Sequence, residues 1–345
     1  MKMKACNRVR RVFAALILLC AGTAGMVQAE IPRASLSVGP LFSYGYADIY
    51  EYVYSLRNGD WWKLSELDWD VHNTLSAGVT ADFSFGRFYF NAGGSAAFPS
   101  ETGLMQDYDW LYLEVADNDH PFDTLTEFSE HEITLEKKDW FSLTAGYTFF
   151  RGKKWSLSPF GGFQHFNTEM MGHDGYLQHS SYGRWEREGY TNDNVHPYDS
   201  SREKYLEEGK VISYQLSFDS LWLGVKSDFK ILPDLNLSCE VCCSPYQLTD
   251  CYDHHYSPGT DNFKLFHDIP ESVFLSRAGL SATFSFGRRS SLCAGASVMN
   301  LPMALGNDYM NVAPGTYGAD PVAGCLGGVA YFGWDVSLSY RIRIF

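Results

Sequence analysis

After its first 29 residues the chain has no apolar run of 18 residues, so no membrane-spanning helix is expected there. It also lacks the short motifs of common hydrolases, namely a Gly-x-Ser-x-Gly turn and a His-Glu-x-x-His helix. A glycine-rich phosphate loop is missing too. These absences leave a serine nucleophile, a helix-borne zinc ion and nucleotide chemistry without support, and no cofactor is expected.

Basic residues are scarce: 27 Lys and Arg stand against 41 Asp and Glu, which gives a formal net charge of −14. An acidic surface repels nucleic acid and suits cationic partners, including basic peptides. A merely solvated acidic surface explains the charge equally well. The composition therefore excludes nucleic acid as a partner and leaves cationic polypeptides open.

The N-terminal segment, residues 1–29, is typical of a secretory signal. It has a basic start, an apolar core at Phe13–Cys20 and a small-residue cleavage site at Val27-Gln28-Ala29. A lipoprotein signal at Leu18-Leu19-Cys20 is a weaker alternative, because Leu before the cysteine matches that pattern poorly. We expect an exported chain of one domain over residues 30–345.

Six of the eight cysteines follow the predicted cleavage site, and an even number in an exported protein permits disulfides. Cys239-x-x-Cys242-Cys243 has no second Cys or His pair at zinc-finger spacing, so a metal site is not expected. Small apolar packing residues or a structural disulfide are the two interpretations that remain.

Strict alternation of apolar and polar residues predicts β-strands. The last segment is the clearest example, with one face consisting of Ala330, Phe332, Trp334, Val336, Leu338, Tyr340, Ile342 and Ile344. Its other face is small or polar. Alternation also runs from Ile212 to Phe218, but the apolar phase changes near Ser220, which predicts a β-bulge.

Short connections alternate with long polar ones along the chain. The short connections contain Gly or Pro, as at Phe85-Gly86-Arg87, and the long ones lie near 57–62, 101–122, 172–208, 252–270 and 303–324. Short turns on one side and long loops on the other are typical of outer-membrane barrels. The sequence therefore predicts an all-β fold, a ten-stranded antiparallel transmembrane β-barrel with long extracellular loops. A soluble β-sandwich is the structural alternative.

Two polar clusters lie where predicted strands run into long loops: Asp107-Tyr108-Asp109-Trp110 and Asp253-His254-His255-Tyr256. Residues at i and i+2 of a strand point to the same face, so Asp107 pairs with Asp109 and Asp253 with His255. Across a barrel mouth, an Asp-oriented His opposite two carboxylates could activate a water molecule. Each cluster alone is more often a solvated loop, but the combination favours hydrolysis.

With both clusters on a ten-stranded exported barrel, the sequence resembles the omptin family of outer-membrane endopeptidases. Asp107-Tyr108-Asp109-Trp110 and Asp253-His254-His255-Tyr256 match the family's Asp-x-Asp-Trp and Asp-x-His-Tyr motifs. Further matches are Glu51-Tyr52-Val53-Tyr54, Ser65-Glu66-Leu67-Asp68-Trp69, His120-Pro121-Phe122-Asp123-Thr124 and Gly162-Phe163-Gln164.

The resemblance implies an aspartic-type endopeptidase. Asp253 would orient His255, and His255 would deprotonate a water positioned with Asp107. Asp109 would support Asp107 and share a proton with it, because two close carboxylates cannot both ionise cheaply. His254 would point to the opposite face.

The resemblance also implies a substrate-binding role for Glu51, at the base of a pocket for a basic side chain before the cut. The family's second acid in that pocket falls on Cys251, and Asp250 would face the wrong way. The sequence therefore predicts weaker discrimination for basic residues than in the family, and sharper discrimination in Cys251→Asp.

The expected partners are polypeptide substrates, some of them cationic, and outer-membrane lipid, including lipopolysaccharide bound at positions the sequence does not reveal. A monomer is expected. The alternatives are a non-enzymatic barrel acting as an adhesin or binding protein, and a small porin. Ten strands leave little open lumen, which disfavours the porin.

Overall fold

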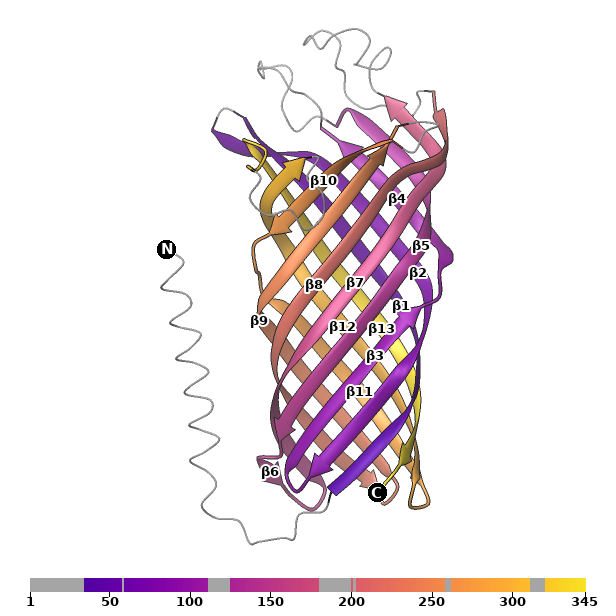
Figure 1. Ribbon diagram of the computed structural model, residues 1–345, viewed down its shortest axis with the longest axis vertical. Coiled ribbons are helices and arrows are strands. Elements are labelled where there is room, and N and C mark those ends of the chain that lie inside the picture. Colours follow the sequence, from indigo (N-terminus) through magenta and orange to yellow (C-terminus); the bar gives the residue numbers. More distant parts are fainter. Residues whose placement is uncertain are drawn as a thin grey trace.

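The computed structural model describes residues 34–57, 59–110, 125–179, 200, 203–257, 262–310 and 320–345 (Figure 1). The predicted signal segment at 1–29 and the match at 120–124 lie outside these residues. Within the described ranges, no helix is long and apolar enough to cross a membrane.

The described residues fold almost entirely into antiparallel strands, most of them long, as the alternating pattern predicts. They are β1 (Ala34–Arg57), β2 (Asp60–Phe85), β3 (Phe88–Ala97), β4 (Ser100–Asp109), β5 (Glu127–Tyr147), β6 (Phe150–Arg151), β7 (Trp155–His179), β8 (Tyr205–Leu232), β9 (Leu235–Tyr256), β10 (Phe263–Pro270), β11 (Leu275–Phe286), β12 (Ser290–Met310) and β13 (Cys325–Arg343).

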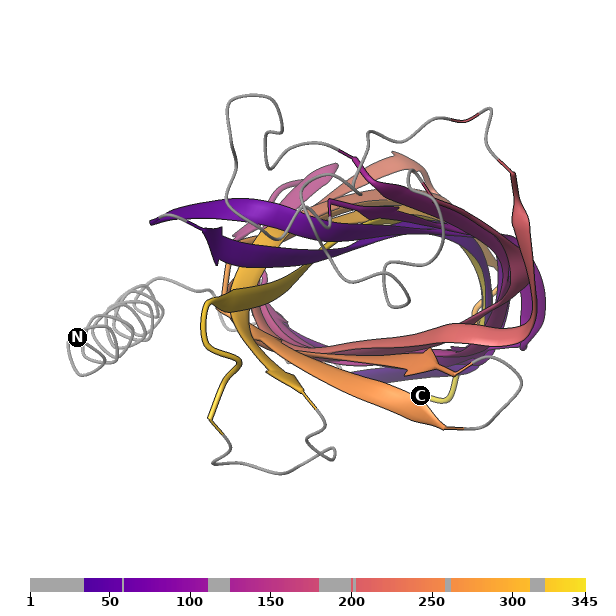
Figure 2. The same cartoon turned by 90° about the horizontal axis from the view of Figure 1, so that it is seen from above.

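These strands close into a barrel, because β1 pairs with β13 along almost its whole length (Figure 2). Two barrel strands are interrupted: β3 and β4 both lie between β2 and β5, and β10 and β11 both lie between β9 and β12. The short β6 pairs with β7. In the described part of the chain this makes the predicted ring of about ten antiparallel strands.

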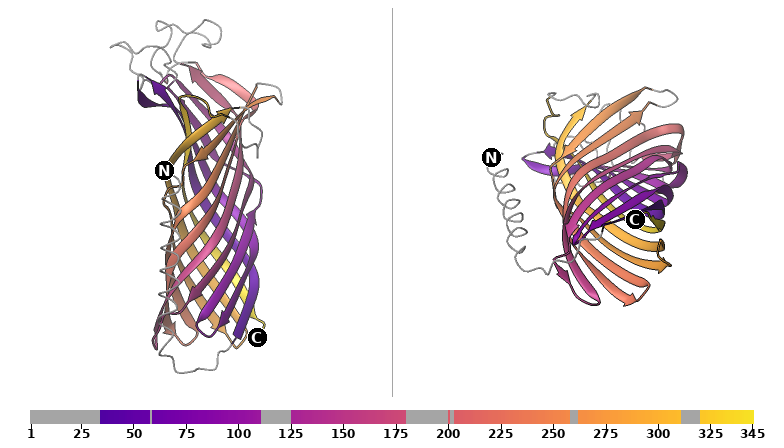
Figure 3. Two further views of the ribbon diagram at one scale, coloured as in Figure 1. Left: turned by 60° about the vertical axis from the view of Figure 1, so that its left-hand side comes forward. Right: turned by 60° about the horizontal axis from the view of Figure 1, so that its bottom comes forward.

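The two ends of the barrel differ as the spacing of the connections predicts. One end carries the short turns, as between β2 and β3, and the C-terminus lies at that same end (Figure 3). Gly86 and Gly287 adopt positive φ angles of 64° and 71° in two of these turns, a conformation that favours glycine. The other end is the mouth, to which the predicted site residues belong.

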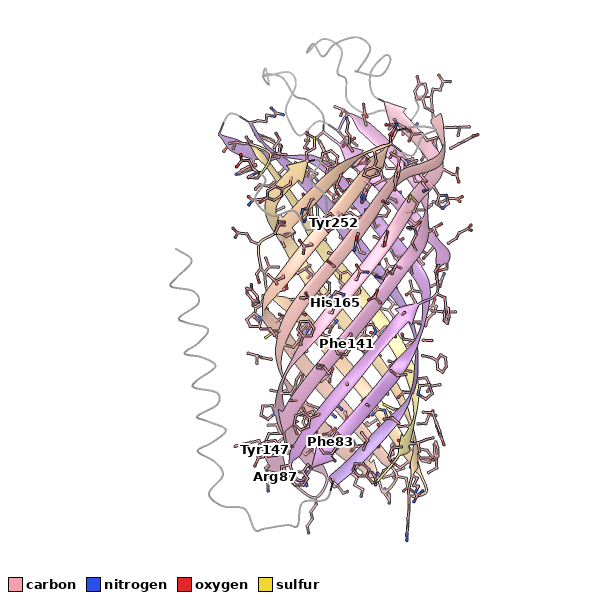
Figure 4. All side chains as sticks on the ribbon, viewed as in Figure 1. Phe83, Arg87, Phe141, Tyr147, His165 and Tyr252 are labelled. Atoms are coloured by element: carbon pink, nitrogen blue, oxygen red, sulfur yellow. The ribbon has the colours of Figure 1, made fainter. Side chains whose placement is uncertain are left out.

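The half of the barrel nearer the turns is apolar on its outside. Its exposed side chains include Val79, Phe141 and Val241, and Figure 4 shows Phe141 beside His165, with Tyr252 nearer the mouth. Above this band the outer wall becomes polar, where His165 lies 2.8 Å from Asp219. An outward apolar band is the lipid-facing surface of an outer-membrane barrel. We call the part of the barrel inside this band the membrane half.

The remaining part, the mouth half, is apolar on its inside. Its core comprises Ile49, Leu67, Trp69, Met105, Ile133, Leu135, Met170, Tyr214, Leu216, Leu301 and Val329, all nearly inaccessible to solvent. This core blocks the lumen below the mouth.

Strand β8 crosses from one half to the other without the bulge predicted near Ser220. Its inward positions continue in phase from Ile212 through Ser220 to Trp222, while Leu221 faces outward. The prediction of a bulge was wrong because the apolar face changes sides, from the interior to the lipid, while the strand keeps its alternation. The extra residue lies on β9, where the β8–β9 register shifts between Leu221 and Leu223.

All six cysteines of the described chain carry free thiols: Cys239, Cys242, Cys243, Cys251, Cys293 and Cys325. Cys242, Cys251 and Cys293 are buried, which agrees with their interpretation as small apolar packing residues. The alternative of a structural disulfide among them is not seen.

Candidate active site

The two aspartates of the first cluster lie at the end of β4 and point into the mouth. Asp107 pairs with Leu67 of β2 and Ser129 of β5, both buried inside the barrel, and cross-strand partners share a face. Asp109 lies two residues further and therefore on the same face. Ser65 Oγ donates a hydrogen bond to Asp107 Oδ1 at 3.2 Å.

A bulge four residues earlier sets this orientation. The β4–β5 register shifts between Glu101 and Leu104, and Gly103 between them has a φ of 52°. A side chain is excluded at that position because a Cβ would lie 1.7 Å from the carbonyl oxygen of Asp70. The glycine thus allows β4 to approach β2 closely while aiming Asp107 and Asp109 inward.

The second cluster ends β9. His255 Nε2 is hydrogen-bonded to Asp253 Oδ2, and Asp253 is buried while His255 is partly open to the mouth. Asp253 pairs with Tyr214 and His255 with Ile212, both of which are buried inside the barrel. The neighbouring His254 instead contacts Ser213 and the ring of Phe263, in agreement with its predicted outward position.

Electrostatic interactions show that the fold brings the two clusters together. Burial and, to a smaller extent, the charge of Asp253 raise the pKa of Asp107 to about 7, against the opposing effect of the hydrogen bond from Ser65. Burial and the charge of Asp107 hold the pKa of Asp109 well above its ordinary range, and the charge of His255 acts in the opposite direction. The carboxylate pair and the Asp–His pair therefore face one another inside the mouth, outside the membrane half.

Two opposing effects act on His255. Burial lowers the pKa of its imidazole, but the charge of Asp253 and the hydrogen bond between them raise it more. The net pKa is raised above the ordinary value. Asp253 thus stabilises the protonated form of His255, which is the form an imidazole takes after it accepts a proton.

Glu51 of β1 is also inside the mouth and almost completely buried. Burial is the main reason that its pKa lies well above the ordinary value, and the charges of Asp253 and Asp268 add to the effect. Cys251 is buried on the same inner face of β9. Asp250 points away, as predicted, and lies 3.2 Å from His267 Nε2.

The apolar core of the mouth half forms the floor of the site. Trp69 and Tyr214 stack with ring centroids 5.8 Å apart, and Tyr214 lies opposite Asp253 on the β8–β9 ladder. Rigid aromatic packing of this kind fixes the strands that carry the polar groups.

Sequence reasoning missed several polar residues that the fold adds to this site. Ser65 belongs to a matched segment but had no assigned role, and Ser129 is hydrogen-bonded to the buried His131 at 3.0 Å. Burial lowers the pKa of His131. Alternation alone could have placed Ser129 and His131 on one face of β5, but only the register with β4 places Ser129 opposite Asp107.

Comparison with known proteins agrees with this geometry. The model of the Omptin family matches residues 33–311, and no curated protein matches the chain. The crystal structure of the outer membrane protease OmpT from Escherichia coli superposes with a TM-score of 0.74 at 15% identity, covering 92% of this chain and 99% of OmpT.

Two other barrels match over much of the chain but superpose poorly. A Pseudomonas aeruginosa FadL homologue gives a TM-score of 0.32 at 13% identity, covering 89% of this chain and 90% of its own. The translocator domain of the autotransporter NalP from Neisseria meningitidis gives 0.32 at 9% identity, with 96% of each chain covered.

The family match spans most of the chain, including both polar clusters, and the OmpT barrel has the same fold. The apolar outer band supports the same location in the cell. The chain belongs to the omptin family and is a multi-pass β-barrel of the outer membrane.

Proposed function

We propose that this barrel is an endopeptidase that hydrolyses extracellular polypeptides at its mouth. Family membership and the OmpT match support an outer-membrane protease. The observation that carries the finer proposal is the meeting of an Asp253–His255 pair with Asp107 and Asp109 inside the mouth.

In the proposed reaction, a water molecule lies between His255 and Asp107. His255 accepts a proton from the water as its oxygen attacks the scissile carbonyl carbon, and Asp253 stabilises the resulting imidazolium. Asp107 accepts a hydrogen bond from the same water, and it does so as the ionised carboxylate. The proton then passes to the leaving amine as the C–N bond breaks, and no covalent intermediate forms.

Asp109 acts on Asp107 rather than on the substrate. Two buried carboxylates so close cannot both ionise cheaply, and burial together with the charge of Asp107 raises the pKa of Asp109 well above its ordinary range. Asp109 therefore holds the proton that leaves Asp107 charged. Glu51 is assigned to substrate binding. It lies next to Asp253, where its carboxylate would neutralise the charge of a basic substrate side chain.

Lipopolysaccharide binding and a monomeric state remain predictions.

The proposal is tested with purified, refolded barrel and internally quenched peptides. The wild type should cleave them, and Asp107→Asn should lower kcat/KM by roughly 100-fold to 10,000-fold, as for loss of a group that handles the attacking water. Glu130→Gln, on the same barrel wall but facing away from Asp107, is the control and should retain activity. A folded wild type that cleaves no peptide, with lipopolysaccharide present, would favour a binding barrel.

A further inference from the structure

Four carboxyl groups from four different strands gather in the mouth: Glu51 on β1, Asp253 on β9, Asp268 on β10 and Asp308 on β12. None is more than 5% exposed. Asp268 and Asp308 played no part in the argument from sequence. We call these four residues the carboxylate cluster.

The strand register places Asp268 at the centre of the cluster. Asp268 is opposite Cys251 on the β9–β10 ladder and opposite Asp308 on the β10–β12 ladder. Asp268 accepts a hydrogen bond from the backbone N–H of Gly328, and the charge of Asp308 acts on it from the neighbouring strand. Its carboxylate lies against Gly327, where a Cβ would come within 1.8 Å of Asp268 Oδ1.

This cluster lacks a compensating cation. In the described part of the chain no Lys or Arg forms an ion pair with Glu51, Asp268 or Asp308. Glu51 Oε2, Asp253 Oδ1 and Asp308 Oδ1 are buried without a hydrogen-bond partner. Unpaired buried carboxylates are costly, so the site is complementary to a cation carrying several N–H donors.

We propose that Asp268, with Glu51 and Asp308, binds the cationic side chain of the polypeptide substrate and is the main determinant of its charge preference. The inference rests on the proposed peptidase function. Asp253 belongs both to the carboxylate cluster and to the pair with His255, so a cation bound in the cluster would lie next to the group that orients the proposed base. An arginine side chain offers five N–H donors in a fixed plane, enough to satisfy the three unpartnered oxygens.

Asp268 changes the expectation based on Cys251 alone. That expectation assumed that Glu51 is the one carboxylate in the pocket for a basic side chain, because the family's second acid is replaced by the thiol of Cys251. Residues opposite one another on a ladder share a face, so the carboxylate of Asp268 takes the place of an acid at 251. A second acid at 251 would then stand directly opposite a like charge, which is destabilising.

The test compares two quenched peptides that differ only in having arginine or its neutral analogue citrulline before the cut. Wild type should cleave the arginine peptide at least tenfold more efficiently, measured as kcat/KM. Asp268→Asn should reduce this ratio about tenfold. Asp250→Asn is the matched control, because Asp250 lies on the opposite face of β9, and it should leave the ratio unchanged.

Two further variants separate charge from folding. Cys251→Asp alone should not raise the ratio, whereas Cys251→Asp combined with Asp268→Asn should restore it, since the carboxylate returns from the other strand. Gly327→Ala, which keeps every charge but displaces the Asp268 carboxylate, should lower the ratio. An unchanged ratio in Asp268→Asn, or a higher ratio in Cys251→Asp alone, would overturn the proposal.

Failure of the peptidase function is distinguished by binding. Fluorescently labelled arginine and citrulline peptides are titrated into the His255→Ala barrel, which should bind without cleaving. Tighter binding of the arginine peptide that disappears in His255→Ala/Asp268→Asn supports the cation site even if the wild type cleaves nothing. Equal binding of both peptides to His255→Ala would rule out the site even if the wild type is a protease.

Discussion

The membrane half and the mouth half of this barrel are built from the same strands with opposite polarity. On β8, Leu216 faces the interior of the mouth half and is 0% exposed, whereas Leu221 faces the lipid and is 47% exposed. In the membrane half the interior is instead polar, with Arg277 2.8 Å from Glu240 and a cavity of about 360 Å³. One half is thus stabilised by lipid around it and the other by its own core.

This difference accounts for the position of the candidate site in the mouth half. A polar interior at membrane depth consists of paired charges, while the mouth half places charged groups on top of an apolar core. Buried carboxyl groups above such a floor keep raised pKa values, as Asp107 and Glu51 do. Perturbed titratable groups in a recess are typical of functional sites.

The largest expected effect is loss of activity in the mouth half. Asp253→Asn and His255→Ala should each lower kcat/KM for peptide cleavage by roughly 100-fold to 10,000-fold. The double variant should be little worse than either single one, because groups acting as a unit are not additive. His254→Ala, on the outer face, should change kcat/KM little. Loss of activity in His254→Ala with retention in His255→Ala would show that the face assignment is reversed.

The two leucines of β8 test the change of polarity directly. Leu216→Ala should lower the free energy of unfolding by about 2–5 kcal/mol, because it leaves a cavity in a packed core. Leu221→Ala should cost far less, since lipid or detergent fills the space. Urea unfolding of both variants in detergent micelles provides the comparison. Equal losses of unfolding free energy in the two variants would contradict the change of polarity between the two halves of the barrel.

A charge on the lipid face tests the membrane half. Val79 is 68% exposed within the apolar band, so Val79→Arg should destabilise the folded barrel in lipid bilayers by roughly 2–4 kcal/mol. Ser217→Arg, on the outer wall of the mouth half, should change stability by no more than about 0.5 kcal/mol. A similar loss of stability at both positions would show that the lipid-facing band extends as far as Ser217.

The pH dependence of cleavage should sharpen the comparison further. In the proposed mechanism the active form has Asp107 as a carboxylate and His255 as a neutral base, so activity should rise with pH through about 7, the pKa of Asp107. The charge of Asp253 raises the pKa of both groups, so the residual activity of Asp253→Asn should rise at lower pH. A pH profile of kcat/KM for each protein measures this. A rise centred below pH 5 in the wild type would exclude these roles.

The smallest effect concerns stability in the carboxylate cluster. Burial and the charge of Asp308 hold the folded-state pKa of Asp268 well above its unfolded value. The contribution of Asp268 to the free energy of unfolding is therefore largest below the pKa it has in the unfolded state. It declines as the pH rises toward the pKa it has in the folded state. Asp268→Asn removes that decline, so the difference in unfolding free energy between the variant and the wild type should shift in favour of the variant between pH 4 and pH 8. Urea titrations at both pH values would detect it, and a pH-independent difference would contradict it.

The sequence by itself determined the barrel, its approximate number of strands and the facing of the two motif pairs. These follow from local rules: a side-chain period of two, short turns with glycine, and long polar loops. The same rules placed His254 and Asp250 on the outer face, as the structure does. A family motif then linked two clusters that no local rule could connect.

Only the tertiary structure decided which face of each strand meets lipid and which meets the core. The change in β8 looked like a bulge because alternation records that a face is apolar, not whether lipid or protein covers it. The position of Asp268 opposite Cys251 also came from tertiary structure. It depends on the register across the loop between β9 and β10, which the pairing of the strands sets and the order of the residues does not.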